Sequence, residues 1–309
     1  METNSLYWAV FGTIVITLLI LDLGVLNKRD HVMTLGQSLS LSLFYITIAC
    51  CFGMYIHYAI GASPAHDYFT GFLLEKAMSL DNIFVISIIF SFFKIPLKYQ
   101  HRVLFWGILG VIILRAIMIS AGAILLAKFS WLLFIFGAIL IVTGIKTLYL
   151  ANNHSFDIND MYVYKLLKKK INIYPELVGN KFIVVENSKV FATPLLMALI
   201  TIEFMDLVFA IDSIPAIFAI TQNTFIVYTS NIFAILGLRA LFFCLADIVE
   251  RFKYIKYSLA LILILIGVKI FAGHFIDIPK YIPLVVTFVL LVLGVLVSLV
   301  MKNRESKLG

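Results

Sequence analysis

Six acidic residues lie inside long apolar stretches of the sequence. They are Asp22, Glu75, Asp81, Glu203, Asp206 and Asp212. Even on a lenient insertion scale, an Asp, Lys or Arg at the centre of a membrane helix costs about 2.5–3.5 kcal/mol. Such side chains must face one another, a water-filled cavity or a bound ion. The alternative is a set of buried salt bridges that only fixes the register of the helices.

The neutral side chains beside these acids favour a hard divalent cation. Asn82 follows Asp81 and Ser213 follows Asp212, so each pair combines a carboxylate with another oxygen atom. Carboxylate, amide and hydroxyl oxygens suit Mn²⁺, Mg²⁺ or Ca²⁺. The six histidines lie at helix ends or in loops, and no Cys cluster occurs that would favour zinc or copper. The predicted metal site comprises Glu75, Asp81, Asn82, Glu203, Asp206, Asp212 and Ser213.

Asp22, Met78 and Met205 have two possible roles each. Asp22 could relay protons, or it could fix the register of its helix with a hydrogen bond. Met78 and Met205 could supply a soft ligand that favours manganese over magnesium, or they could simply pack in the interior.

Helix geometry limits which acids can share one ion. Glu203 and Asp206 are three residues apart and share a helix face. Asp206 and Asp212 are six apart and differ by roughly 240° around a regular helix. They converge on one ion only if the helix is broken or if two helices contribute. Pro215 frees the carbonyl group of Ile211, so an unwound segment there could offer backbone oxygens to a cation.

Five basic residues also lie within apolar stretches: Lys76, Arg115, Lys146, Arg239 and Lys269. Arg115 and Arg239 are too deep to reach water easily, so we expect them to hold acids in place. Lys146 and Lys269 either support the site in the same way or extend their ammonium groups to the membrane surface. Lys76 is expected to face another acid.

The acids belong to a pattern that occurs twice. Three pairs of segments match in the same order: residues 75–83 with 206–214, 114–116 with 238–240, and 144–146 with 267–269. Each unit contains three predicted helices, so the second copy enters the membrane from the opposite side. Inverted repeats of this kind are found in many secondary transporters, which bind substrate near the midplane where the repeats meet.

Composition requires a membrane protein. The 309 residues are 62% hydrophobic and only 13% charged. About 20 apolar residues cross the hydrocarbon core as a helix. Nine such segments are predicted: 6–26, 37–60, 68–92, 103–127, 130–150, 193–221, 226–249, 257–276 and 281–301. The predicted fold is therefore an all-α polytopic membrane protein, with nine transmembrane helices and two inverted three-helix repeats.

The predicted organisation has five parts: helices one and two in 1–67, the first repeat in 68–150, a cytoplasmic linker in 151–192, the second repeat in 193–276, and the last helix with its tail in 277–309. In the linker, a short helix is expected after Asp160. A hairpin over 181–190 is expected to turn at Asn187 and Ser188.

Basic residues in the loops predict the orientation. One set of alternating loops and the tail carries most of the Lys and Arg, whereas the opposite set has only Lys128 and Lys280. The positive-inside rule then places the N-terminus outside and the C-terminus in the cytoplasm. The net charge of +7 is explained by these loops and does not indicate nucleic-acid binding.

Three segments resemble the TerC family of membrane proteins: 75–85, 202–216 and 229–239. The likeness extends over nearly the whole chain, and the nine-helix form is similar to the Alx-type members. The resemblance implies a bacterial inner-membrane manganese exporter of the LysE-like superfamily. It also explains names that refer to tellurium resistance, which need not describe the physiological role. The family's acidic positions carry over onto Glu75, Asp81, Glu203, Asp206 and Asp212.

The predicted function is export of divalent cations, above all Mn²⁺, driven by proton antiport. Mn²⁺ is the substrate and no permanently bound cofactor is expected. A phosphate-binding loop of an ATPase does not occur in the sequence, so an ion gradient must drive uphill export. The alternatives are export of another cationic solute, a non-transporting membrane assembly factor and an intramembrane aspartyl protease. We expect no enzymatic activity.

Overall fold

The computed structural model of the chain describes residues 5–24, 35–150, 171–186, 189–245, 255–273, 279 and 281–308. The helices of these regions are α1 (Ser5–Gly24), α2 (Leu35–Ala59), α3 (Ala62–Phe92), α4 (Leu97–Lys128), α5 (Leu132–Leu150), α7 (Pro194–Ile220), α8 (Thr224–Leu236), α9 (Leu238–Leu245), α10 (Ile255–Ala272) and α11 (Tyr281–Leu308). Every predicted span coincides with a helix, or with α8 and α9 in succession.

Seven of the described helical spans are long and apolar enough to cross a membrane. The helices α1 and α3 are not among them. The apolar part of α1 is shorter, from Ser5 to Leu21. In contrast, α3 is long, but Glu75, Lys76 and Asp81 fall within seven of its residues. The helix α3 thus carries charged residues of the predicted site within its apolar sequence.

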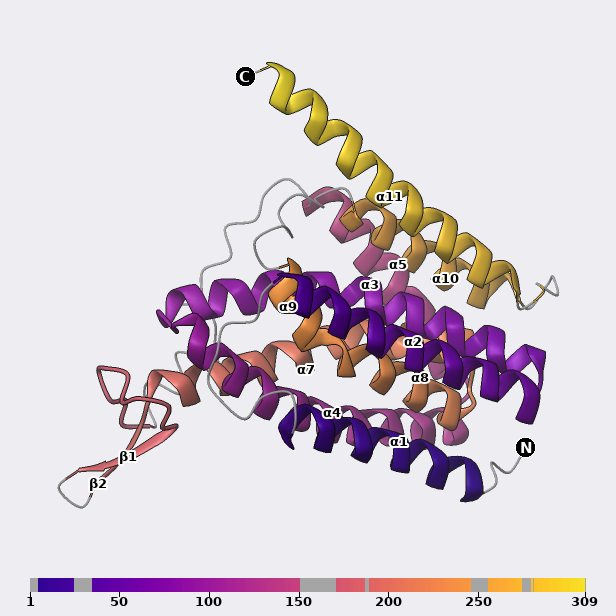
Figure 1. Cartoon of the computed structure of the whole chain (residues 1–309). Helices are drawn as coiled ribbons and strands as arrows, with labels where there is room; N and C mark the ends of the chain where they lie inside the picture. The colour runs from indigo at the N-terminus through magenta and orange to yellow at the C-terminus, as the bar shows by residue number, and fades with distance from the viewer. Residues whose placement is uncertain are drawn as a thin grey trace.

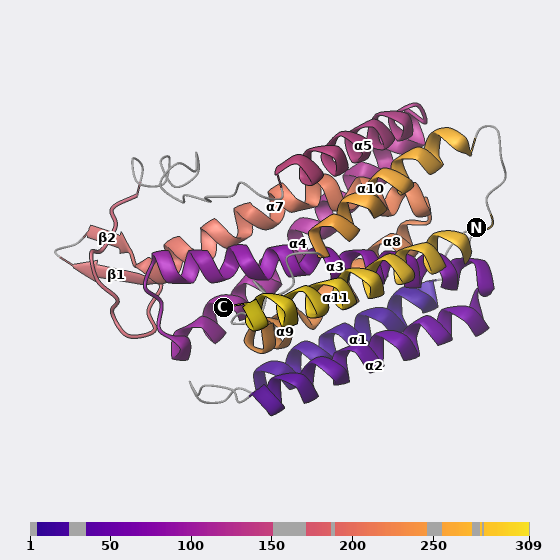
Figure 2. The same ribbon diagram turned by 90° about the horizontal axis from the view of Figure 1, so that it is seen from above.

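The helices α3, α7 and α8 lie in the middle of the molecule, and α4 packs against α7 and α8 (Figures 1 and 2). The span made by α8 and α9 is the most enclosed, with 89% of it buried, against 17% for α5 and for α11. On one side, α5 lies along α10. A Cβ atom on Gly144 would be 2.7 Å from the carbonyl oxygen of Ala260, so small residues allow these two backbones to approach closely.

Two details of the central helices differ from the predictions. The α7 helix continues past Pro215 without a break, so the predicted unwound segment is wrong. Proline is tolerated within membrane helices because neighbouring groups satisfy the freed carbonyl. The predicted helix over 226–249 is instead interrupted at Gly237, which separates α8 from α9.

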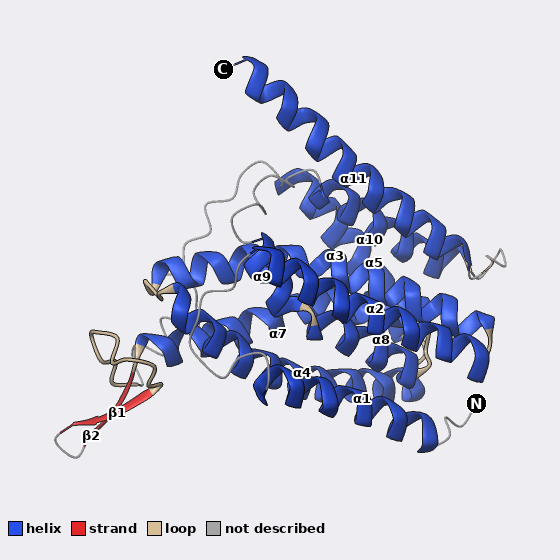
Figure 3. Ribbon diagram, in the orientation of Figure 1, coloured by secondary structure: helices blue, strands red, loops and turns tan. Residues whose placement is uncertain are grey.

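The linker contains the predicted hairpin. Strand β1 (Ile183–Glu186) pairs antiparallel with β2 (Lys189–Ala192), at one end of the molecule (Figure 3). Glu186 lies opposite Lys189, so only two residues, 187 and 188, connect the strands, as predicted. The expected helix after Asp160 lies outside the described residues.

Candidate functional site

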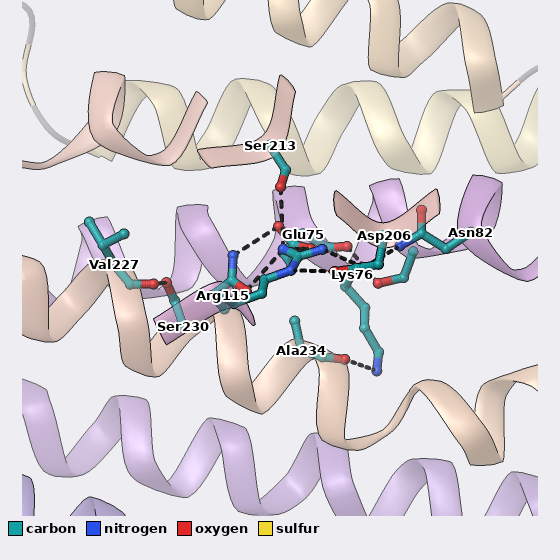
Figure 4. A network of polar contacts seen from close by, with 11 residues as sticks. Glu75, Lys76, Asn82, Arg115, Asp206, Ser213, Val227, Ser230 and Ala234 are labelled. Atoms are coloured by element: carbon teal, nitrogen blue, oxygen red, sulfur yellow. Dashed lines mark hydrogen bonds and ion pairs between the residues drawn. The ribbon is translucent and has the colours of Figure 1, made fainter. Parts of the chain in front are cut away.

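Arg115 of α4 is the centre of a buried polar cluster at the point where four helices meet. Its side chain is 1% exposed. Nη1 lies 2.5 Å from Oε1 of Glu75 on α3, and Nη2 lies 2.9 Å from Oδ1 of Asp206 on α7. Nε also donates to the second oxygen of Asp206, at 3.2 Å, so this pair is bidentate. Arg115 thus contacts two of the predicted acids (Figure 4).

Asn231 of α8 completes this cluster and was not among the predicted site residues. Its amide oxygen accepts from Nη1 of Arg115 at 2.9 Å, and its amide nitrogen donates to Oε2 of Glu75 at 3.1 Å. Asn231 therefore fixes both members of that ion pair. The sequence did contain a signal for this residue. Asn231 carries an amide within an apolar segment, and amide side chains frequently hydrogen-bond between membrane helices.

The Arg115 cluster borders on a cavity of about 140 Å³ between α3, α4, α5, α7 and α10. Its polar wall includes Asp81 and Asn82 from α3, Asp212 and Ser213 from α7, and Thr143 and Thr147 from α5. Glu75, Arg115 and Met78 also line it. The second acid of each sequence copy, with its neighbouring polar residue, thus reaches one cavity, because two helices contribute.

Polar contacts around the cavity connect it to α5 and to the Arg115 cluster. Thr143 donates a hydrogen bond of 3.0 Å from its hydroxyl group to Oδ1 of Asp212. Lys146, one turn further along α5, is close enough for its charge to act on Asp212. Asn82 makes a long contact of 3.5 Å with Oδ1 of Asp206, and Ser213 lies 3.3 Å from Nη1 of Arg115. The cavity therefore shares a wall with the ion-paired cluster.

Glu203 lies apart from this cavity. Its carboxyl group packs against the backbone of α4 at Gly110, where a Cβ atom would be 2.2 Å from Oε1. Both of its oxygens are buried, and neither has a hydrogen-bond partner among the described residues. The shared helix face with Asp206 does not bring Glu203 into the wall of the cavity.

Lys76 contacts the interruption between α8 and α9. Its ammonium group donates to the carbonyl oxygen of Ala234 at 3.0 Å, so the expectation that Lys76 faces an acid is wrong (Figure 4). A helix that ends leaves its last carbonyl groups without intrahelical donors, and a cation there is favourable. A Cβ atom on Gly237 would be 2.8 Å from the ammonium nitrogen, so glycine makes room for this contact.

The other residues considered in the sequence analysis have fewer described contacts. Arg239 is buried at the start of α9, and its pairing with an acid stays a prediction. Lys269 lines an apolar cavity between α10 and α11. Met205 is buried in the core, as the packing alternative expected. Asp22 belongs to α1, but its side chain lies outside the described residues.

In the described parts of the chain, no three His, Cys, Asp or Glu side chains gather closely enough to hold a metal ion. The seven predicted ligands thus fall into three sets, of which the first two share Glu75 because it also lines the cavity. Glu75 and Asp206 bind Arg115, whereas Asp81, Asn82, Asp212 and Ser213 line the cavity, and Glu203 lies against α4.

Comparison with known proteins agrees with the architecture. The chain is 64% identical over 296 residues to an "Uncharacterized membrane protein" of Rickettsia bellii, covering 96% of this chain and 98% of that protein. It is 40% identical over 313 residues to the Escherichia coli K12 protein named "Putative membrane-bound redox modulator Alx", covering 98% and 97%. No solved structure matches. Residues 60–306 match the model of the "Integral membrane protein TerC family", and the chain belongs to that family.

Proposed function

We propose that this membrane protein exports divalent cations from the cytoplasm, with Mn²⁺ as its principal substrate. The observation that carries the proposal is the cavity into which Asp81 and Asp212 both reach. These residues occupy the same position in the two sequence copies. Two carboxylates balance the charge of one divalent ion.

The ligand chemistry of the cavity supports a hard cation. Asn82 and Ser213 add neutral oxygens to the two carboxylates, and Thr143 and Thr147 contribute hydroxyl groups to the wall of the cavity. A cavity of about 140 Å³ has room for a cation that keeps some of its waters. Small divalent ions dehydrate reluctantly and commonly combine one or two carboxylates with water. Met78 also lines the cavity, and its thioether would favour manganese over magnesium.

The arrangement of the helices supports the proposal of two inverted repeats. The first helix of one copy, α3, packs against α8, and its counterpart α7 packs against α4. The third helices, α5 and α10, pack against each other. Arg115 also joins the first acid of each copy, Glu75 and Asp206. In this proposal the protein lies in the bacterial inner membrane, with its N-terminus outside and its C-terminus in the cytoplasm.

Export needs an energy source. Moving two charges against 100 mV costs about 4.6 kcal/mol. Protons are the natural counter-ion, because carboxyl groups in the membrane can bind a proton when a cation leaves. The proposed cycle therefore moves Mn²⁺ outward and protons inward.

Manganese accumulation in cells with and without the protein tests this function. Cells that lack it should accumulate more Mn²⁺ and tolerate less of it, and the intact chain should reverse both effects. Equal manganese content in the two strains would contradict the proposal. Competition by a cationic amino acid instead of Mn²⁺ would indicate the other solute class, and co-purified partners without a metal phenotype would indicate an assembly factor.

The name of the E. coli relative adds one more outcome to this test. All three cysteines of this chain, Cys50, Cys51 and Cys244, are free, and none lines the cavity. Thiol redox state should therefore be measured in the same cells. A redox change that appears without any change in manganese content would favour a redox role over export.

A further inference from the structure

Glu203 of α7 is an acidic side chain without a polar partner in the described part of the chain. Both of its oxygens are buried, although the rest of the side chain is partly exposed. An isolated carboxylate is very costly in an apolar environment unless donors or a counter-ion compensate for the lost water. The neutral, protonated form of the carboxyl group is therefore the less costly one in these surroundings.

The carboxyl group of Glu203 lies in a small space beside two glycines of α4, which we call its glycine seat. A Cβ atom on Gly110 would lie 2.2 Å from Oε1 and 2.5 Å from the carboxyl carbon of Glu203, and one on Gly107 would lie 3.8 Å from Oε1. The carboxyl group thus occupies the space that a side chain would fill. A divalent cation needs about six oxygen ligands. Among the described residues, no polar group is hydrogen-bonded to Glu203 there, so the position suits a neutral carboxyl group better than a metal ion.

Glu203 is linked to the ion-paired cluster through Asp206. Asp206, one turn along α7, is the charged residue that acts on Glu203. On α4, the guanidinium group of Arg115 is bonded to Asp206 and to Glu75. A negative charge on Glu203 would therefore act first on the Asp206–Arg115 pair, which borders on the cavity.

We propose that Glu203 is a dedicated proton carrier of the exporter, separate from the cation cavity lined by Asp81 and Asp212. This inference rests on the proposed function and specifies where the counter-ion binds. One proton from the outer side forms the O–H bond of the Glu203 carboxyl group, and the same bond breaks when the proton is released to water on the cytoplasmic side. Each release leaves a carboxylate against α4, which must move away from its glycine seat to reach a donor or water. Proton release thereby biases the contact between α4 and α7.

The test uses the purified chain in proteoliposomes with the membrane voltage held at zero. A gradient of one pH unit coupled to one proton supports about a tenfold Mn²⁺ concentration ratio. Glu203→Gln keeps the shape of the neutral carboxyl group but cannot release a proton. We expect this variant to lower the gradient-driven ratio about tenfold, while Mn²⁺ exchange at equal concentrations and equal pH stays within about twofold of wild type.

Glu176→Gln, in the linker, is the matched control and should keep the full ratio, because Glu176 is exposed. Full gradient-driven accumulation by Glu203→Gln would overturn the inference alone. So would loss of exchange in a variant that remains monodisperse, because Glu203 would then serve the cation path.

If Glu203→Gln does not fold, Glu203→Asp decides: it should still accumulate Mn²⁺ but with a shifted pH profile, and an unchanged profile overturns the inference. A wild-type chain that moves no Mn²⁺ overturns the proposed function, and the inference with it.

Discussion

The Arg115 cluster and the neighbouring cavity use similar residues for different ends. In the cluster, Glu75 and Asp206 are bonded to Arg115, and Asn231 holds Arg115 and Glu75 together. The cavity has Asp81 and Asp212 beside open space. One region is closed by its own ion pairs, whereas the other combines two carboxylates with a volume of about 140 Å³ that is large enough for a ligand.

The two regions have one origin in the sequence. Each copy carries an acid, five intervening residues and an Asp. Six residues correspond to roughly 240° around a helix, so the two acids of one copy cannot face the same point. Both first acids bind Arg115 and both second acids line the cavity, which Glu75 also borders. A motif that resembles a single metal-binding cluster is thus divided into a structural half and a ligand-binding half.

Arg115→Gln should have the largest effect, and it should fall on the structural half. The substitution leaves two buried carboxylates without their cation, which costs about 3–5 kcal/mol when one partner of a buried pair is removed. We expect low abundance in the membrane and a clearly lowered unfolding temperature in detergent. Arg115→Lys should recover only part of the stability, because an ammonium group cannot make the bidentate contact with Asp206. Wild-type stability of Arg115→Gln would show that the cluster is not structural.

Asp81→Asn and Asp212→Asn should affect transport while they spare the fold. Each removes one anionic ligand from the cavity but keeps the volume of the side chain. We expect loss of Mn²⁺ tolerance with normal abundance. The matched pair is Glu75→Gln and Asp206→Asn, which should lower stability as well because they remove bonds to Arg115. If all four variants behave alike, the division between the two regions is wrong.

Much of this arrangement could be predicted from the sequence. Continuous apolar segments determine where helices form, because backbone groups in lipid must be satisfied internally. The expense of a buried charge likewise predicts that Arg115 contacts acids. The hairpin in the linker follows from its two short apolar strands and the turn residues between them.

The remaining features depend on how helices approach one another, which periodicity does not specify. Glu203 and Asp206 share a face of α7, yet Glu203 lies against the glycines of α4 whereas Asp206 binds Arg115. Pro215 predicts a break in α7, but α7 is continuous. A break occurs instead at Gly237, between α8 and α9, where Lys76 from α3 satisfies a free carbonyl group. A long-range partner of this kind cannot be inferred from the local sequence of either helix.

Thr143→Val should have the smallest effect, and it examines the ligand-binding half alone. Thr143 bonds Asp212 at 3.0 Å and so orients one of the two carboxylates. Loss of one such hydrogen bond costs about 1 kcal/mol, which corresponds to about a fivefold higher Kd for Mn²⁺. Calorimetric titration of the purified protein with Mn²⁺ measures this change. Thr147 lines the same cavity without a described bond to Asp212. The control Thr147→Val should therefore stay within about twofold of wild type. Equal losses of Mn²⁺ affinity in the two variants would mean that both hydroxyl groups act as ligands. The orientation of Asp212 would then not depend on Thr143.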